Sequence, residues 1–156
     1  MDNATREHEP TGAEQMPQLM LESQLCFPLY AAARRVVNRY TPYFKPLGIT
    51  YTQYILFLAL WEHDNSTVGD LCRMLYLDNG TVTPVLKKME ESGYLKRVRS
   101  EDDERVVTVS LTEEGWAMRE KAADIPGMMG NCGSLTGEEA GHLYSILYKL
   151  LDQLKA

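Results

Sequence analysis

The sequence predicts a mainly α-helical chain with one small β-hairpin, which is an α+β fold. Helix-capping residues precede apolar residues in helical spacing at four places, Thr50, Thr67, Thr112 and Thr136. The hairpin is predicted where Leu95–Arg99 and the alternating stretch Arg105–Leu111 flank a polar turn. The 156 residues, 44% of them hydrophobic, suffice for one domain with a substantial core.

Composition narrows the classes of function. Acidic residues outnumber basic ones by 22 to 16, and the net charge of −6 argues against a nonspecific nucleic-acid coat. The net charge does not exclude a local DNA-binding face, because residues 25–60 contain basic residues and no acidic one. The longest apolar run, Tyr54–Trp61, is too short to cross a bilayer, and the N-terminus does not resemble a signal peptide. We therefore expect a cytoplasmic protein that does not enter membranes.

Metal and cofactor chemistry has little support in the sequence. The three cysteines, Cys26, Cys72 and Cys132, form no CxxC pair, and the three histidines are scattered. Structural zinc sites need clustered ligands, so we expect no metal, and no motif predicts a cofactor. In a cytoplasmic protein these thiols are expected to be reduced.

The N-terminal part should hold a leader and one long helix. Residues 1–20 lack periodicity and contain prolines, which predicts a flexible leader. Within residues 21–50 a helix should run from Ser23 to about Phe44. Because proline is tolerated only in the first helical turn, Pro28 indicates that this helix begins close to Cys26 or bends there.

Residues 51–111 are predicted to form a winged helix-turn-helix. One helix carries the apolar stripe Val68, Leu71, Cys72 and Leu75. The next carries the stripe Val82, Val85, Leu86 and Met89. Gly93 ends the second helix and the hairpin follows directly, which is the winged form of the motif.

Residues 112–156 should form two further helices. The first begins at Thr112 and ends by Pro126–Gly127, and the glycine-rich loop Gly127–Ser134 leads to the second. The last helix carries an apolar stripe of Leu143, Leu147, Leu150 and Leu154. Because that stripe is more apolar than an isolated helix should be, we expect a partner chain to cover it.

Two sets of segments resemble a known family. The run LYLDNGTVTPVLKKMEESGYLKRVRSEDDERVVTVSLTEEG contains Asp103-Glu104-Arg105, a D-x-R wing signature, and resembles the core of the MarR family of transcriptional regulators. QLCFPLYAAAR and LGITYTQY resemble the organic-hydroperoxide-sensing branch of that family. The resemblance extends from about residue 21 to the end. It implies a homodimeric repressor whose interleaved N- and C-terminal helices form a dimerisation domain, bound to a palindromic operator in double-stranded DNA.

The resemblance places the recognition helix at about residues 79–92. Thr81, Thr83 and Pro84 would face base edges, while lysines behind them would hold phosphates. Arg105 would enter the minor groove with its guanidinium oriented by Asp103. The full set of predicted DNA-binding residues is Asp78, Asn79, Thr81, Thr83, Pro84, Lys87, Lys88, Arg97, Arg99, Asp103 and Arg105.

Cys26 is the predicted redox sensor. A helix N-terminus stabilises the thiolate, which is the reactive form of cysteine. Tyr30, Tyr40 and Tyr51 follow Cys26 by 4, 14 and 25 residues, the spacing of the sensor branch. The resemblance implies that Tyr40 and Tyr51 of the other subunit hydrogen-bond the sulfur. Oxidation by an organic hydroperoxide would then release the DNA, and either Cys132 or a small thiol would form the subsequent disulfide.

Other interpretations stay open at this stage. A MarR-type repressor released by a small aromatic ligand would need no thiol oxidation. A thiol peroxidase would turn over peroxide without DNA, although the sequence has no nucleophile–base pair and we expect no enzyme. A winged helix that binds only protein would tolerate charge reversal at Arg105.

Overall fold

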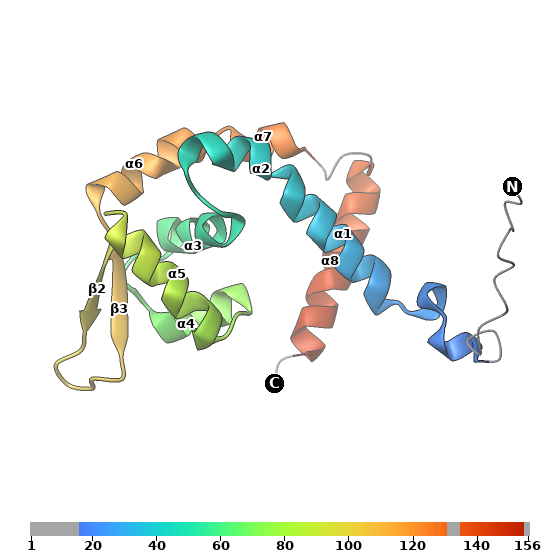
Figure 1. The fold of residues 1–156 in the computed structure, drawn as a ribbon, viewed down its shortest axis with the longest axis horizontal. Helices are drawn as coiled ribbons and strands as arrows, with labels where there is room; N and C mark the ends of the chain where they lie inside the picture. The colour runs from blue at the N-terminus through green and yellow to red at the C-terminus, as the bar shows by residue number, and fades with distance from the viewer. Residues whose placement is uncertain (1–15, 131–134, 155–156) are drawn as a thin grey trace, which may run out of the picture. The chain divides into compact units, whose positions relative to one another are not determined.

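The computed structural model describes residues 16–130 and 135–154 (Figure 1). The chain forms two compact units, Met1–Arg39 and Tyr40–Ala156. The described residues are mostly helical, with one small antiparallel sheet, which confirms the predicted fold class. Among them, no helix combines the length and apolar character that crossing a bilayer requires.

The first unit is built around one helix. Two short 3-10 turns, η2 (Pro17–Leu19) and η3 (Leu21–Ser23), precede α1 (Cys26–Arg39). Most of the predicted leader lies outside the described residues, and the described residues 16–20 include η2. Helix α1 begins at Cys26 with Pro28 in its first turn, as predicted, and none of its residues is buried.

The first predicted helix is shorter than expected. It ends at Arg39 rather than near Phe44, and residues Thr41–Phe44 form a separate turn of helix, α2. Pro42 lies in the first turn of α2. Proline has no N–H to donate to the carbonyl four residues earlier, so the hydrogen-bond ladder of α1 stops before it.

The second unit contains the winged helix-turn-helix. In chain order its elements are α2, η4 (Lys45–Leu47), α3 (Tyr51–Glu62), β1 (Ser66–Thr67), α4 (Val68–Leu75), α5 (Asn79–Glu91), β2 (Leu95–Arg99), β3 (Val107–Leu111), α6 (Glu113–Ala122), α7 (Ile125–Met129) and α8 (Gly137–Gln153). Helices α3, α4 and α5 pack together, and the β2–β3 hairpin projects beside them (Figure 1).

The helix starts follow the predicted caps. Capping boxes with both hydrogen bonds begin α3, α4 and α8 at Thr50, Thr67 and Thr136. The hydroxyl of Thr112 accepts from the backbone N–H of Gly115 and caps α6. After α5, Gly93 takes the left-handed conformation with φ +80°, which ends the helix as predicted.

The sheet has three antiparallel strands in the order β1-β3-β2. Strand β2 lies where predicted, and its partner begins at Val107 rather than Arg105, with Leu95 opposite Leu111 and Arg99 opposite Val107. The short β1 was not predicted; its pairing puts Ser66 opposite Val109. A strand of two residues is too short to show an alternating sequence pattern, so β1 is defined only by its pairing with β3.

The hydrophobic core lies inside the winged helix-turn-helix. Its fully buried side chains come from α3, α4, α5 and the sheet, and the largest are Phe57, Leu56, Leu60, Leu71, Leu86, Met89, Leu95, Val82 and Val109. The two predicted apolar stripes supply several of them. The opposite face of α5 therefore stays exposed to solvent.

The C-terminal part departs from the predicted boundaries. Helix α6 ends at Ala122, and Pro126 and Gly127 lie inside the short helix α7 rather than marking an end. Proline fits there because it lies in the first turn, where its missing N–H costs nothing. Helix α8 has no buried residue, and its exposed apolar side chains include Leu143, Tyr144, Ile146 and Tyr148.

Candidate DNA-binding surface and thiol site

The start of α5 is held by a local network. The Asp78 carboxylate accepts from the backbone N–H of Thr81 at 2.8 Å and from its hydroxyl at 3.0 Å. These bonds lower the pKa of Asp78, the backbone bond contributing most. The structure thus makes Asp78 the N-cap of the predicted recognition helix, with Thr81 exposed beside it.

The exposed face of α5 carries the predicted contact residues. Pro84, Lys87 and Lys88 are exposed, while Thr83 is half-buried at the edge of a pocket. Side chains of the opposite stripe, such as Val82, are buried. The helix therefore presents one polar and basic face to solvent, as recognition of a DNA groove requires.

The wing carries an exposed arginine that its neighbour orients. Arg105 is 91% exposed, and its Nε lies 3.2 Å from Oδ1 of Asp103. The backbone N–H of Arg105 donates to the same oxygen at 3.0 Å, and this bond is the main cause of the lowered pKa of Asp103. The structure thus contains the contact through which Asp103 is predicted to orient Arg105.

Arg97 and Arg99 differ in their surroundings. Arg99 is exposed on β2, as contact with a DNA backbone requires. Arg97 is half-buried, and its guanidinium donates to Oε2 of Glu90 at 2.7 and 2.9 Å. Sequence reasoning placed Arg97 beside the DNA backbone and missed Glu90, because charge alone does not show which partner a side chain takes.

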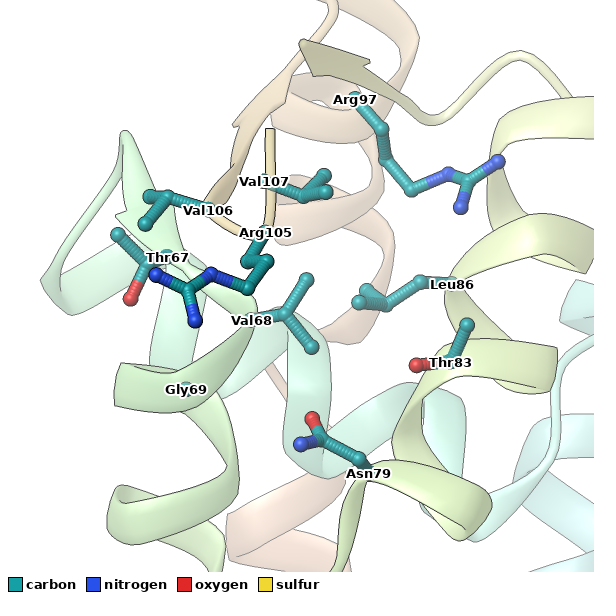
Figure 2. Close-up of a pocket in the computed structure, with 10 residues that line it drawn as sticks. All are labelled: Thr67, Val68, Gly69, Asn79, Thr83, Leu86, Arg97, Arg105, Val106 and Val107. Carbon is teal, nitrogen blue, oxygen red and sulfur yellow. The ribbon is translucent and has the colours of Figure 1, made fainter. Parts of the chain in front are cut away.

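A pocket of about 380 Å³ lies between α4, α5 and the wing (Figure 2). Val68 from α4, Thr83 and Leu86 from α5, and Arg105 and Val107 from the wing line it. The recognition helix and the wing therefore form opposite walls of one hollow on the same surface (Figure 2).

The predicted sensor cysteine lies at the start of α1. Cys26 is the first residue of that helix and is exposed. Tyr30 follows one turn later and is 62% exposed. Tyr30 lines a hollow on α1 together with Phe27 and Arg34. The predicted first-turn position of Cys26 is confirmed.

The other two tyrosines predicted to support the sensor, Tyr40 and Tyr51, belong to the second unit. The rings of Tyr40 and Tyr51 lie edge to face with centroids 5.2 Å apart. They form one cluster with Phe44 and the buried Tyr54, whose centroids are 4.9 Å apart. The ring centroids of Tyr40 and Tyr54 lie 6.0 Å apart. Burial, and then the neighbouring Tyr40 and Tyr51, raise the pKa of Tyr54.

Sequence reasoning missed Phe44 and Tyr54 as supports of this tyrosine cluster. Their spacing was a usable signal, because Phe44 lies four residues after Tyr40 and Tyr54 three residues after Tyr51.

The remaining cysteines differ from Cys26. The half-buried Cys72 donates its S–H to Oδ1 of Asn79 at 3.3 Å, and burial raises the pKa of its thiol. A raised pKa reduces the thiolate fraction, so Cys72 is poorly suited to peroxide sensing. Cys132 lies outside the described residues. Among the residues that the structure describes, no group of side chains could hold a metal ion.

Comparisons with known proteins identify transcriptional regulators as relatives of this chain. The family model for the transcriptional regulator SarA/Rot matches residues 39–124. The chain is 49% identical over 136 residues to the organic hydroperoxide resistance transcriptional regulator of Bacillus subtilis, covering 87% of this chain and 92% of that protein. The chain belongs to the MarR family, in its organic-hydroperoxide-sensing branch. It is a DNA-binding transcriptional regulator rather than an enzyme.

Solved structures of related regulators share the fold. Reduced AbfR bound to DNA is 32% identical, with a TM-score of 0.73 over 92% of this regulator and 99% of that chain. AbfR comes from Staphylococcus epidermidis. A disulfide form of AbfR matches with a TM-score of 0.59 over 92% and 97% of the chains at 33% identity. The structure of a MarR variant of E. coli with operator DNA shows the shared fold. It is 22% identical to this chain, with a TM-score of 0.70 over 90% of this chain and 98% of that chain.

Proposed function

We propose that this regulator is a homodimeric repressor that binds a palindromic operator and releases it when an organic hydroperoxide oxidises Cys26. The observation that carries the proposal is the exposed thiol in the first turn of α1, in a chain so similar to a hydroperoxide resistance regulator. A protein that represses transcription must reach the chromosome, so we place it in the cytoplasm.

Operator binding would use α5 and the wing together. The exposed face of α5 suits the major groove, and the exposed Arg105 suits the minor groove beside it. Lys87, Lys88 and Arg99 are exposed and would contact phosphates. The AbfR structures bound to DNA support this assignment in a related fold.

Replacing Arg105 tests the DNA-binding half of the proposal. Arg105→Ala should weaken operator binding by about 1–3 kcal/mol, the usual worth of a good groove contact. Lys121→Ala, on α6 and also exposed, is the matched control and should bind like wild type. Equal affinity of the Arg105 variant and wild type at matched salt would argue against the wing contact.

We expect a second copy of the chain to pack against α1 and α8. Neither helix buries a residue within the single chain, and α8 exposes Leu143 and Ile146 by 43% and 64%. Isolated helices of this length are marginal in water unless an apolar face packs against something. Sedimentation should therefore give twice the chain mass, whereas a monomer at micromolar concentration would contradict the dimer.

The redox step balances with thiol and peroxide alone. The Cys26 thiolate attacks one peroxide oxygen, the O–O bond breaks, an alcohol leaves and a sulfenic acid forms. A second thiol then displaces the sulfenic oxygen as water and gives a disulfide. Cys132 of the other subunit and a small thiol are both candidates for that second thiol.

Disulfide formation is the better candidate for the releasing step. AbfR has been solved both with a disulfide and, in an overoxidised form, bound to DNA. An overoxidised form of that relative therefore still binds DNA. In this regulator, a new covalent link would displace the two recognition helices more than added oxygen would.

The phenols of Tyr40 and Tyr51 would hydrogen-bond the Cys26 sulfur across the dimer, with Tyr30 closing the site. Tyr51→Phe keeps the ring packing seen in the cluster but removes one phenol hydroxyl. It should slow Cys26 oxidation by a hydroperoxide and leave operator binding of the reduced form unchanged. Equal oxidation rates would exclude the phenol from the sensor site.

Release by a small aromatic acid is the second candidate function. The pocket of Figure 2 combines apolar Val68 and Leu86 with Arg105, which suits a flat ring bearing a carboxylate. This mechanism predicts release by the ligand with every thiol still reduced. Operator gel shifts with hydroperoxide, and with salicylate as a model aromatic acid, each followed by mass analysis of the thiols, separate the two mechanisms.

A further inference from the structure

Glu90 makes an unusually complete contact with the first strand of the wing. Its Oε2 accepts from Nε and Nη2 of Arg97 at 2.9 and 2.7 Å, and its Oε1 accepts from the backbone N–H of Arg97 at 2.9 Å. Both carboxylate oxygens of Glu90 therefore accept hydrogen bonds from Arg97. The Arg97 side-chain bond is the main cause of the lowered pKa of Glu90, which keeps the carboxylate charged.

The pair joins the two elements that would contact DNA. Glu90 lies in the last turn of α5 and Arg97 at the centre of β2, so the contact closes a short loop through Gly93. The backbone bond fixes the strand itself, not only a side chain. A half-buried, charge-assisted contact of this kind holds geometry better than an exposed pair does.

The geometry of Arg97 differs from that of a phosphate-binding arginine. Its side chain is 22% exposed, whereas that of Arg105 is 91% exposed. The two guanidinium groups also point to opposite sides of the pocket in Figure 2, with Arg97 directed toward α5. The charge of Arg97 is already neutralised by Glu90, so little counterion release is left for it to contribute.

We propose that Glu90 and Arg97 are positioning residues that fix the angle between the recognition helix and the wing. Through this pair, α5 and Arg105 are held in the arrangement that fits two adjacent grooves of one operator. The inference rests on the proposed operator binding, and it assigns to Arg97 an internal role instead of a contact with the DNA backbone.

A double-mutant cycle with a salt series tests the pair. Glu90→Ala, Arg97→Ala and the double variant are compared for operator binding and for binding to a scrambled duplex, by fluorescence anisotropy at several salt concentrations. Positioning predicts that each single change weakens operator binding about tenfold and that the double change is no worse than either. Binding to the scrambled duplex and the salt slope should stay as in wild type.

A phosphate contact at Arg97 would give a different pattern. Arg97→Ala would then weaken operator and scrambled duplex alike and lower the salt slope by about one, while Glu90→Ala would leave binding unchanged or tighter. That pattern, or wild-type binding by both single variants, overturns the positioning role. Lys87→Ala is the matched control that should show the phosphate pattern, because Lys87 is exposed on the same helix.

Two further comparisons keep the outcomes distinct. Glu90→Gln and Arg97→Lys retain size and some hydrogen bonding, so they should bind the operator with intermediate affinity even if the alanine variants fold poorly. If wild type itself fails to prefer the operator over the scrambled duplex, the proposed function fails. If wild type shows the preference and the Glu90 variants keep it, only the positioning role fails.

Discussion

Gly115 lies where α6 packs closely against the segment before β2 and against β3. A Cβ atom added there would lie 2.1 Å from the carbonyl oxygen of Tyr94 and 2.9 Å from Cδ2 of Leu111. That carbonyl accepts from the backbone N–H of Thr112, so it cannot move alone. Trp61 also donates from Nε1 to the carbonyl oxygen of Gly115 at 3.1 Å. Alanine at this position must therefore push α6 away from the sheet.

The cost of Gly115→Ala follows from these contacts. Overpacking a closely packed site costs about 1–3 kcal/mol. Weakening the Trp61 hydrogen bond adds about 1 kcal/mol. Alanine is favoured over glycine within a helix by about 1 kcal/mol, which offsets part of this. The expected net loss in the free energy of unfolding is about 1–3 kcal/mol, or about 2–12 °C in Tm for a chain of this size.

Thermal unfolding followed by circular dichroism measures this loss. Protein concentration must be matched, because the Tm of a dimer depends on concentration. Gly127→Ala is the control, since a Cβ at Gly127 meets nothing within 4 Å and the position lies inside α7, away from the helices expected to pack against a second copy. It should melt at or slightly above the wild-type temperature. A Gly115→Ala protein that does the same would refute the close-packing account of α6.

Three further predictions follow from other parts of the chain. Thr112→Val should lose about 1–2 kcal/mol in urea unfolding and Thr112→Ser much less, because the hydroxyl both caps α6 and donates to the carbonyl of Gly93 at 2.6 Å. Glu90 has a lowered pKa in the folded state, so its stabilising effect is fully present above the ordinary glutamate pKa and is lost as the pH falls through the lowered value. Wild-type Tm should therefore fall more than that of Glu90→Gln between about pH 6 and about pH 3, and parallel curves would count against the Arg97 contact. If Cys132 is the resolving thiol, Cys132→Ser should remove the hydroperoxide-induced dimer band on nonreducing gels, and a persisting band would assign that role to another thiol.

The sequence predicted the features that depend on neighbouring residues. Capping boxes at Thr50, Thr67 and Thr136 each link residues three apart, so their sequence pattern already contains the geometry. The Asp103–Arg105 contact in the wing spans only two residues, and it was expected from the D-x-R signature of the family that the sequence resembles. Helix type and most starting positions followed from these local signals.

Features that depend on distant residues were missed. Strand β1 exists because Ser66 pairs with Val109, far along the chain. The partner of Arg97 lies across a turn on another element, and Tyr54 supports Tyr40 only once α2 and α3 are folded. The predicted end of the first helix was wrong because the apolar pattern continues past Pro42, where the backbone hydrogen bonds stop.

One titration tests the central claim most directly. Reduced protein on a labelled operator is treated with increasing cumene hydroperoxide, and each sample is divided between fluorescence anisotropy and mass analysis of every cysteine. The central claim predicts that operator release rises in proportion to the disulfide form of Cys26 and that Cys26→Ser stays bound throughout. Release while Cys26 remains a free thiol, or full release of the Cys26→Ser protein, would contradict it.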